Sequence, residues 1–360
     1  MVKEADRAGL ETILNLIFSI SPKHTDEYYA QKAREAAALK VFRICLKDPG
    51  GLLTPDRTRR LVPIVLRNSG GIPVEFHTHC NTGLGPLCCV EAIESGIKIV
   101  NTAIPPLANG SSNPSLFNVA ANARAIGHTP NINEQPLNRI ADHFTSIAKR
   151  EALPVGAPVE YDAYHFIHQV PGGMISNFRH QLSKLGMEEQ LGEVLEETGR
   201  VRTEFGYPIM VTPYSQFVGV QAAMNVILGE RYKEVTDEAI QYALGLWGEE
   251  EAASMDLNVR DKILDRPRAR ELAKSETTEP SLKDVRKKLG GRGVSDDDLL
   301  LRFFAGTEEV AAMRAAGPPK SYISVRQPFL ALIEELAKKT SYRQIYIRNS
   351  RLSLRLEKKN

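Results

Sequence analysis

The sequence predicts an α/β protein in which strand–helix units precede a mainly helical region and a short C-terminal β-hairpin. Up to Ile126, apolar strand-like segments alternate with helical segments at intervals of about thirty residues, which is typical of parallel strands joined by right-handed crossovers. From about Pro136 to Gly248 the chain reads as helices separated by Gly and Pro. Near the end, two alternating runs flank Asn349 and Ser350 and predict the hairpin.

The first part of the chain predicts four strand–helix units. Its strands are expected at Leu10–Ser21, Val41–Leu46 with Lys47 at the end, Pro73–His79 and Ile97–Ala103, and its helices at 25–39, 54–68, 84–95 and 114–126. Two of these helices begin at Thr25 and Thr54, each followed by acidic residues, as expected for helix N-caps. Four parallel strands are half of an eight-stranded barrel, so both outer strands would have unpaired edges.

The later part of the chain predicts further helices and one polar connector. The expected helices are 137–150, 173–185, 188–205, 216–228, 237–246, 296–305 and 326–339, and a short helix-like segment is expected at Val2–Ala8. The stretch from Glu250 to Ser295 is polar and interrupted by Pro, which predicts a surface connector with short helices. Two alternating runs, Ile345–Arg348 and Leu352–Leu356, are the expected hairpin strands.

Composition excludes several classes of protein. Hydrophobic residues at 42% and charged residues at 25% are ordinary for a soluble globular protein. The basic residues after Asp256 are mixed with acids and have few aromatic neighbours, so they predict solvated surface and no nucleic-acid binding. No apolar run reaches membrane-spanning length, and the N-terminal residues lack a signal-peptide core. We therefore expect no membrane insertion and a cytoplasmic location.

The four cysteines predict reduced thiols. Cys45, Cys80, Cys88 and Cys89 lack paired CxxC spacing and lie beside predicted core segments. We interpret them as core residues.

The third predicted strand ends in His77-Thr78-His79, which is the main candidate for a functional site. Because side chains alternate along a strand, both imidazoles project from one face at its carboxyl end, which is half of a metal site. The alternative is that they are packed or hydrogen-bonded core histidines. Lys47 lies at the same end of the preceding strand, where a parallel barrel carries its chemistry, and this favours the metal site.

The same alternation makes a second prediction, about charges deeper in these two strands. If Lys47, His77 and His79 face one side, Arg43 and Glu75 face that side as well. Unpaired buried charges are costly, so we expect Arg43 and Glu75 to pair beneath the site. The alternative is a bulge that turns one of the two charges outward.

Several motifs together resemble one enzyme family. They are Lys47-Asp-Pro-Gly-Gly-Leu-Leu-Thr-Pro55, His77-Thr-His79, Ser19-Ile-Ser-Pro22 with His24-Thr25, Asn101-Thr-Ala-Ile-Pro-Pro-Leu-Ala-Asn-Gly110, Gln169-Val-Pro-Gly-Gly-Met-Ile-Ser-Asn177 and Val211-Thr-Pro-Tyr-Ser-Gln216. In this order and spacing, they resemble the carboxyltransferase barrel of biotin-dependent enzymes. That family includes pyruvate carboxylase, the oxaloacetate decarboxylase alpha subunit and the transcarboxylase barrel subunit. The resemblance covers nearly the whole chain.

The resemblance implies a set of site residues. His77 and His79 match two metal-binding histidines, and Lys47 matches a carbamylated lysine that is the third ligand. A desolvated lysine amine can take up carbon dioxide, and a carbamate beside two imidazoles suits zinc, manganese or cobalt. Thr212 matches a threonine that shuttles a proton between the enol of the keto acid and carboxybiotin. Its alternative role is to cap the helix predicted at Gln216–Leu228.

The resemblance also implies a reaction and partners. The expected function is transfer of a carboxyl group between carboxybiotin and pyruvate or oxaloacetate. Biotin is expected on another chain because Ala312-Met313-Arg314, the nearest look-alike of a biotin site, has no acceptor lysine. A biotin carboxyl carrier protein and a biotin carboxylase subunit are the implied partners.

The match begins at what resembles the fifth strand of a (β/α)8 barrel. We therefore expect the C-terminal half of a TIM-type barrel, without the aspartate ligand and the substrate-binding arginine of the other half. The expected domains are 1–130 (partial barrel), 131–250 (helical carboxylase-associated domain) and 251–360 (basic connector, helices and hairpin). Such a chain should form homo-oligomers or pair with a chain that supplies the N-terminal half-barrel. The alternatives are a non-catalytic fragment or assembly subunit of such a complex, and an unrelated metal-dependent aldolase or lyase.

Overall fold

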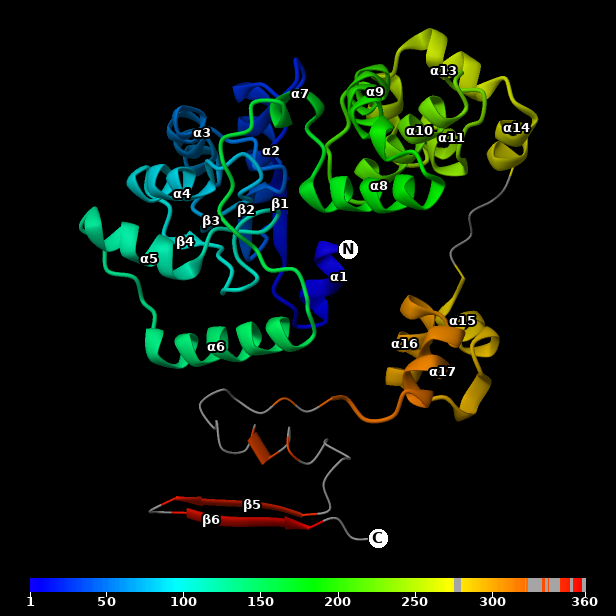
Figure 1. Cartoon of the computed structure of the whole chain (residues 1–360). Helices are drawn as coiled ribbons and strands as arrows, with labels where there is room; N and C mark the ends of the chain where they lie inside the picture. Colours follow the sequence, from blue (N-terminus) through cyan, green and yellow to red (C-terminus); the bar gives the residue numbers. More distant parts are fainter. Residues whose placement is uncertain are drawn as a thin grey trace. The chain divides into compact units, whose positions relative to one another are not determined.

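The computed structural model of this chain describes residues 1–274, 280–320, 322, 332–333, 336, 344–349 and 352–357. These residues form two compact units, one over Met1–Ala273 and one over Lys274–Asn360. The first unit contains a parallel sheet and a helical region, and it carries the candidate site (Figure 1).

The first unit is built on a four-stranded parallel sheet whose strands follow chain order. The strands are β1 (Ile13–Ile17), β2 (Arg43–Asp48), β3 (Val74–Thr78) and β4 (Ile99–Val100), and the helices after them are α2 (Asp26–Ala38), α3 (Pro55–Asn68), α4 (Gly85–Glu94) and α5 (Leu116–Ala125). The predicted strand–helix alternation is confirmed. As predicted, Thr25 and Thr54 cap their helices, since their hydroxyls accept hydrogen bonds from the backbone N–H groups of Tyr28 and Arg57.

The two outer strands are shorter than predicted. The strand expected over Leu10–Ser21 is β1 only at its centre, and Leu10 and Ile13 near its start are exposed, so the predicted length of this strand is wrong. β4 contributes two residues, after which Ala103 makes an isolated bridge with Ser115. In the part of the chain that the structure describes, each outer strand pairs on one side only, so fewer hydrogen bonds hold it extended.

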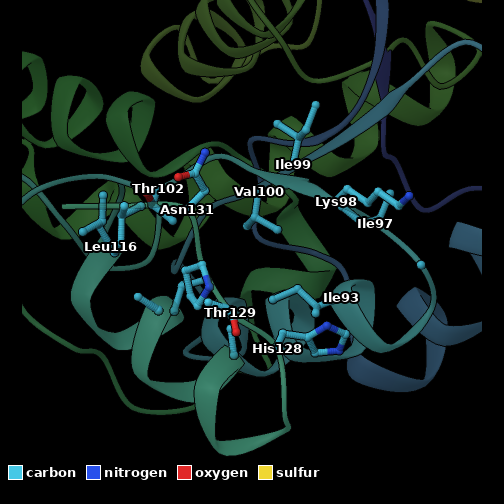
Figure 2. A pocket seen from close by; sticks show the side chains of 16 residues that line it. Ile93, Ile97, Lys98, Ile99, Val100, Thr102, Leu116, His128, Thr129 and Asn131 are labelled. Atoms are coloured by element: carbon cyan, nitrogen blue, oxygen red, sulfur yellow. The ribbon is translucent and has the colours of Figure 1, made fainter. Parts of the chain in front are cut away.

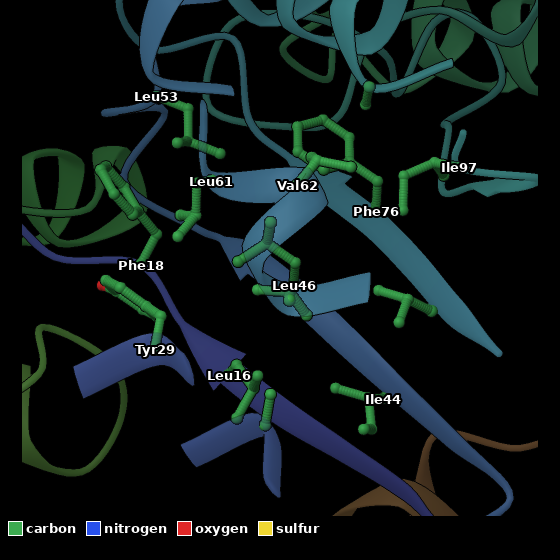
Figure 3. Packing of buried hydrophobic residues seen from close by; sticks show 14 of the residues in the cluster. Leu16, Phe18, Tyr29, Ile44, Leu46, Leu53, Leu61, Val62, Phe76 and Ile97 are labelled. Carbon is green, nitrogen blue, oxygen red and sulfur yellow. The ribbon is translucent and has the colours of Figure 1, made fainter. Parts of the chain in front are cut away.

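The core of the sheet region lies between the strands and the helices that follow them. Figure 3 shows Leu16, Ile44, Leu46 and Phe76 from the strands beside Leu61 from α3, and all of these side chains are buried. Burial of one large apolar side chain contributes about 1.5–3 kcal/mol. This packing fixes the strands against the helices and thereby the positions of the residues at the strand ends.

The rest of the first unit is helical. Its helices are α1 (Val2–Arg7), α6 (Glu134–Arg150), α7 (His165–His168), α8 (Gly172–Leu185), η1 (Glu188–Gln190), α9 (Leu191–Glu204), α10 (Tyr214–Ile227), α11 (Asp237–Ala243), α12 (Glu249–Ala253), α13 (Leu257–Leu264) and α14 (Pro267–Lys274). A second core lies among α8 to α14 and is rich in aromatic rings. The ring of Phe217 lies 5.2 Å from that of Tyr242 and 5.5 Å from that of Trp247, centroid to centroid.

Part of the predicted surface connector is buried. Met255, Ile263 and Ala269 belong to the second core, so the interpretation of this stretch as solvated surface is wrong up to α14. α13 and α14 bury one residue each, Ile263 and Ala269, so few apolar residues mark these helices as part of a core in the sequence. The predicted division into domains 1–130, 131–250 and 251–360 stays a prediction.

The second unit contains short helices and a hairpin. Its elements are α15 (Leu282–Lys288), η2 (Gly291–Gly293), α16 (Asp296–Ala305), α17 (Thr307–Ala315), β5 (Gln344–Asn349) and β6 (Leu352–Glu357). The helix predicted at 296–305 and the antiparallel hairpin strands are confirmed. The helix predicted at 326–339 falls almost entirely outside the described residues, as does Ser350 of the expected turn.

Two further predictions can be compared with the described residues. Cys45, Cys80, Cys88 and Cys89 are all buried and free, as expected. Across the described ranges, no helix has the length and apolar character needed to cross a membrane.

Candidate active site

The candidate site begins at the carboxyl ends of β2 and β3. Lys47 lies directly beside His77 in the parallel register, so the two side chains share one face of the sheet. His79 follows two residues later, just past the end of β3. The structure thus brings together the three residues that the sequence nominated as metal ligands.

The two histidines point the same nitrogen at each other. His77 Nε2 lies 3.1 Å from His79 Nε2. The opposite nitrogens are held by other groups: His77 Nδ1 lies 3.0 Å from Asn101 Oδ1, and His79 Nδ1 lies 2.7 Å from the backbone oxygen of Ser111. Because each ring is held at its far side, the pair is oriented by the loop after β4 as well as by β3.

The electrostatics of the pair favour neutral imidazoles. Burial and, to a lesser degree, nearby His77 and Lys47 lower the pKa of His79 to about 4. Burial also lowers the pKa of His77, followed by the effect of Lys47, while the contact with Asn101 acts in the opposite direction. Near neutral pH both rings are therefore uncharged, the form in which histidine binds metals.

The loop after β2 is held rigidly by a buried carboxylate. Asp48 is fully buried and accepts hydrogen bonds from the backbone N–H groups of Leu52 and Leu53 and from the hydroxyl of Thr78 on β3. Burial is the largest influence on Asp48 and raises the pKa of its carboxyl to about 6, although each of these donors lowers it. This bracing fixes Lys47, the residue before Asp48.

A second set of contacts ties the same loop to the loop after β3. Asn81 donates to the backbone oxygens of Pro49 and Gly50, and Thr82 donates to that of Gly51. Gly51 has φ of +64°, and a Cβ there would lie 2.9 Å from the backbone oxygen of His79. This close approach requires glycine, and it explains the Gly-Gly step after Lys47-Asp48-Pro49.

The predicted charge pair beneath the site is confirmed. Arg43 Nη1 lies 3.5 Å from a carboxylate oxygen of Glu75, whose side chain is buried. The residue facing Glu75 across the ladder is Cys45, so Arg43 reaches diagonally from two residues earlier. The alternative, in which a bulge turns one charge outward, is wrong.

A cavity of about 740 Å³ lies between the sheet region and the helical region, and two of the predicted site residues line it. His79 lines it from the sheet side and Thr212 from the helical side, although they are far apart in the sequence. The N-terminal turns of α8 and α10 form much of the remaining wall, including Gly172 and Gln216. Lys47 and His77 do not line this cavity but lie next to His79.

The contact between the two regions is made by polar groups at the end of β1. The Gln169 amide donates to the backbone oxygen of Ile20 and accepts from its N–H. The guanidinium of Arg202, which is almost completely buried, donates to the same oxygen of Ile20. These three bonds hold α8 and α9 against the carboxyl end of the sheet and so form the cavity.

Thr212 does not cap a helix. α10 begins at Tyr214 with Pro213 at the N-cap position, and no side chain caps it, so the alternative role of Thr212 is wrong. Within the described residues, the Thr212 hydroxyl has no hydrogen-bond partner, and the residue is exposed to the cavity. Its hydroxyl is free to contact a bound molecule.

The donor set of the site fits a metal ion in part. In the described part of the chain, no three His, Cys, Asp or Glu side chains gather as a metal-binding cluster. Two imidazole nitrogens 3.1 Å apart are nevertheless close enough to share one ion bound at about 2.0–2.1 Å from each. Lys47, directly beside His77, is the group that would have to complete such a set.

A separate cavity lies along the free edge of β4. It has a volume of about 590 Å³ and is lined mainly by apolar side chains. Figure 2 shows Ile99 and Val100 of β4 on one side of it, Leu116 of α5 nearby, and His128 and Thr129 from the following segment. None of the predicted site residues lines this cavity.

Comparisons with known proteins identify relatives of this chain. A family model described as HMGL-like matches residues 1–143, and one described as a conserved carboxylase domain matches residues 166–311. A pyruvate carboxylase subunit of Methanocaldococcus jannaschii is 36% identical over 250 residues, which cover 69% of this chain and 44% of the relative. The corresponding pyruvate carboxylase subunit of Methanothermobacter thermautotrophicus is 34% identical, over 79% of this chain and 50% of the relative.

A solved structure shares the fold. The carboxyl transferase domain of Rhizobium etli pyruvate carboxylase superimposes with a TM-score of 0.75 at 22% identity, covering 88% of this chain and 56% of that chain. These matches give the chain an HMGL-like region and a conserved carboxylase region, and the solved structure shows that the chain shares the α/β fold of a carboxyl transferase domain. The chain belongs to the pyruvate carboxylase family of carboxyltransferases, as the sequence motifs predicted. It spans about half the length of the curated relatives it matches.

Sequence reasoning missed two of the residues that shape the site. Asn101 and Ser111 hold the far sides of the two imidazoles, yet neither was nominated. Asn101 carries a usable signal, since it is a polar residue directly after a strand at the same carboxyl edge as His77. Ser111 acts through its backbone oxygen, which the sequence cannot reveal.

Proposed function

We propose that this chain is a carboxyltransferase component that moves a carboxyl group between carboxybiotin and pyruvate or oxaloacetate. The observation that carries the proposal is the 740 Å³ cavity in which His79 and Thr212 meet, with His77 and Lys47 beside His79. Family membership supports it, because the curated relatives include pyruvate carboxylase subunits.

His77, His79 and Lys47 are the residues that would hold a divalent zinc, manganese or cobalt ion. Lys47 would take part as a carbamylated lysine. Such an ion, when bound, polarises a keto acid and stabilises its enolate. The chain's own part is to present two neutral imidazole nitrogens 3.1 Å apart. It also fixes the lysine beside them through the Asp48-braced loop. The aspartate and arginine expected in the other half of the barrel would complete the site.

Thr212 is proposed as the proton relay. A hydroxyl both donates and accepts a hydrogen bond, so it can pass a proton between the enol and carboxybiotin when both lie in the cavity. Its lack of a partner among the described residues supports this role. Carboxyl transfer should fall by roughly 10²–10⁴-fold in Thr212→Ala and stay largely intact in Thr212→Ser.

The assay for this role combines the chain, a biotinylated carrier protein, a complementing half-barrel and pyruvate. Thr203→Ala is the matched control, because the exposed Thr203 hydroxyl bonds only within α9. Unchanged turnover in Thr212→Ala would remove the relay from the mechanism. A parallel assay with 2-oxoglutarate tests the other keto acid suggested by a relative, the 2-oxoglutarate carboxylase large subunit of Hydrogenobacter thermophilus, which is 31% identical over 308 residues.

The metal site has a test of its own. Metal content should be stoichiometric in the completed barrel and lost when either histidine is replaced. A His77→Ala/His79→Ala double variant that keeps full metal occupancy would exclude the site. That result, together with the absence of measurable carboxyl transfer, would favour the alternative function, a non-catalytic fragment or assembly subunit.

We further propose that the sheet is the C-terminal half of a (β/α)8 barrel. The parallel order β1-β2-β3-β4 and the apolar cavity along the free edge of β4 support this proposal. Its proposed partners are a chain with the N-terminal half-barrel, a biotin carboxyl carrier protein, a biotin carboxylase subunit, or a second copy. Several relatives are themselves named as subunits, among them the 5S subunit of Propionibacterium freudenreichii methylmalonyl-CoA carboxyltransferase, and this supports the existence of partner chains.

The half-barrel proposal predicts how the isolated chain behaves. Alone it should self-associate or aggregate and transfer no carboxyl groups, because among the described residues the outer edges of β1 and β4 have no strand partner. A chain that supplies four βα units should restore solubility and activity together. Size-exclusion chromatography with a coupled pyruvate-dependent assay measures both, and an active, stable monomer would contradict the proposal.

A further inference from the structure

The contact between the two imidazoles raises a question of proton placement. A neutral imidazole has one N–H donor and one acceptor nitrogen. His79 Nδ1 lies 2.7 Å from the backbone oxygen of Ser111, which can only accept, so Nδ1 carries the proton of His79. His79 Nε2 therefore presents a lone pair to His77 Nε2, 3.1 Å away. The tautomer of His77 decides whether an N–H group or a second lone pair faces His79 Nε2.

The tautomer of His77 is in turn decided by Asn101. The Asn101 side chain lies 3.0 Å from His77 Nδ1, and an amide can offer either its oxygen or its NH₂ group by a half-turn. With the oxygen toward His77, Nδ1 is protonated and both Nε2 lone pairs converge. With the NH₂ group toward His77, Nε2 is protonated and donates to His79. Only the first arrangement leaves room for a cation shared by the two rings.

We propose that Asn101 is a positioning residue that selects the tautomer of His77 and thereby sets the affinity of the histidine pair for a divalent cation. This inference rests on the metal site in the proposed function. The structure places the amide oxygen of Asn101 at His77 Nδ1. Without a cation, we expect repulsion between the two facing lone pairs to favour a half-turn of this amide, which brings its NH₂ group to Nδ1 and allows a His77–His79 hydrogen bond. Cation binding then requires the Asn101 amide to turn back. The amide orientation preferred without a cation therefore opposes cation binding.

A carboxylate at position 101 removes the choice. Asn101→Asp offers acceptors only, so Nδ1 of His77 must carry the proton and both Nε2 lone pairs face the cation position. We expect zinc to bind at least about tenfold more tightly, as for groups that orient ligating histidines. Asn101→Leu keeps a similar volume but orients neither tautomer, and zinc should bind about 10- to 100-fold more weakly than in the unchanged chain.

The experiment compares these variants in the chain combined with the complementing half-barrel, by competitive zinc titration and by ¹⁵N NMR of histidine side chains labelled in this chain only. Without zinc, His77 should be protonated at Nε2 in the unchanged chain and at Nδ1 in Asn101→Asp. Zinc should convert the former to the latter tautomer. Asn113→Leu is the control, since the Asn113 amide bonds to the backbone oxygen of Thr78 and to neither histidine.

The NMR readout separates this inference from the proposed function. Zinc binding that depends on His77 but is equal within twofold in all Asn101 variants would overturn the inference and leave the metal site standing. If no variant binds zinc, the metal site fails, and the tautomers without zinc still decide the role of Asn101. The same His77 tautomer in the unchanged chain and in Asn101→Asp would also overturn it. The added charge of Asn101→Asp attracts a cation whichever tautomer is present, so the tautomer itself, and not zinc affinity alone, is the readout for the role of position 101.

Discussion

The sheet region and the helical region of the first unit bury their carboxylates in different ways. In the sheet region, Asp48 is satisfied mainly by backbone N–H groups of the loop that follows it. In the helical region, Glu197 is almost completely buried and accepts hydrogen bonds from Arg231 and Asn225, at 2.7 Å each. Arg231 also binds both carboxylate oxygens of Glu204 at 2.8 Å.

This contrast shows which region depends on single side chains. The backbone donors around Asp48 come with the loop conformation, so no one distant residue supplies them. The guanidinium of Arg231, in contrast, is shared by two carboxylates on α9. Losing that one side chain would leave Glu197 with Asn225 and the more distant Arg200, and Glu204 with the hydroxyl of Tyr232. A buried charge that loses its close cation costs far more than a missing surface pair.

The largest effect is therefore expected for Arg231→Met. It should lower the free energy of unfolding of the first unit by about 3–5 kcal/mol, because the buried Glu197 loses the cation that contacts it at 2.7 Å. Urea unfolding followed by circular dichroism measures the change. Arg200→Met is the matched control: Arg200 lies 3.8 Å from the same Glu197 but is largely exposed, so its loss should cost about 0.5 kcal/mol or less. Equal costs for the two variants would contradict the contrast between regions.

The second effect concerns acid. Burial lowers the pKa of His24 in the sheet region and of His168 in the helical region to about 4 each. A histidine whose folded pKa lies below its unfolded value of about 6.5 takes up protons more readily when unfolded. Stability should therefore be complete above about pH 6.5 and fall as the pH drops toward 4, by roughly 2 kcal/mol for His24 after allowing for partial solvation.

Substitution isolates this acid effect. His24→Gln should flatten the stability profile between about pH 6.5 and 4, whereas His128→Gln, at an exposed position, should leave it unchanged. The contribution of Asp48 to stability changes with pH in the opposite direction. The pKa of Asp48 is raised to about 6, so its share of stability is complete below its unfolded value of about 4 and is lost as the pH rises through 6. A dependence of stability on pH that becomes steeper in His24→Gln would contradict the assignment of the acid effect to His24.

The fold of the sheet region could be predicted because its signals are local. Strand alternation, the capping Thr25 and Thr54, and the breaks at Gly and Pro are all encoded within a few residues. The helical region was predicted less completely. α7 is a four-residue helix without a periodic pattern, and α13 buries a single residue, so neither has a signal in its own sequence.

The same distinction applies to the site. Lys47, His77 and the Arg43–Glu75 pair follow from a period of two along adjacent strands, and the register confirms their placement. The position of Thr212 opposite His79 depends on how α8 and α10 pack against the sheet, which the sequence alone does not specify. The metal and relay roles of these residues stay predictions.

The third effect tests the packing that forms the cavity. Gly219 on α10 lies against α8, and a Cβ there would collide with the ring of Phe178 and lie 2.7 Å from the terminal carbon of Met174. Gly219→Ala should cost about 1–3 kcal/mol of stability through overpacking. Gly173→Ala is the control, because Gly173 is in the first turn of α8 and nothing lies within 4 Å of its added Cβ. A Gly219→Ala variant as stable as the control would mean that α8 and α10 separate without cost.

The smallest effect is expected beneath the candidate site, for Arg43→Met. Arg43 reaches Glu75 through one contact of 3.5 Å, which is longer than a hydrogen bond, whereas Arg231 contacts Glu197 at 2.7 Å and Glu204 at 2.8 Å. The loss of Arg43 should therefore cost only about 1 kcal/mol, against 3–5 kcal/mol for Arg231→Met. Arg43→Lys keeps the charge and should cost less still. Urea unfolding of both variants beside Arg231→Met gives the comparison under one set of conditions. A cost above about 3 kcal/mol for Arg43→Met would mean that Glu75 relies on its arginine as fully as Glu197 does, and that the two regions bury charge by the same means after all.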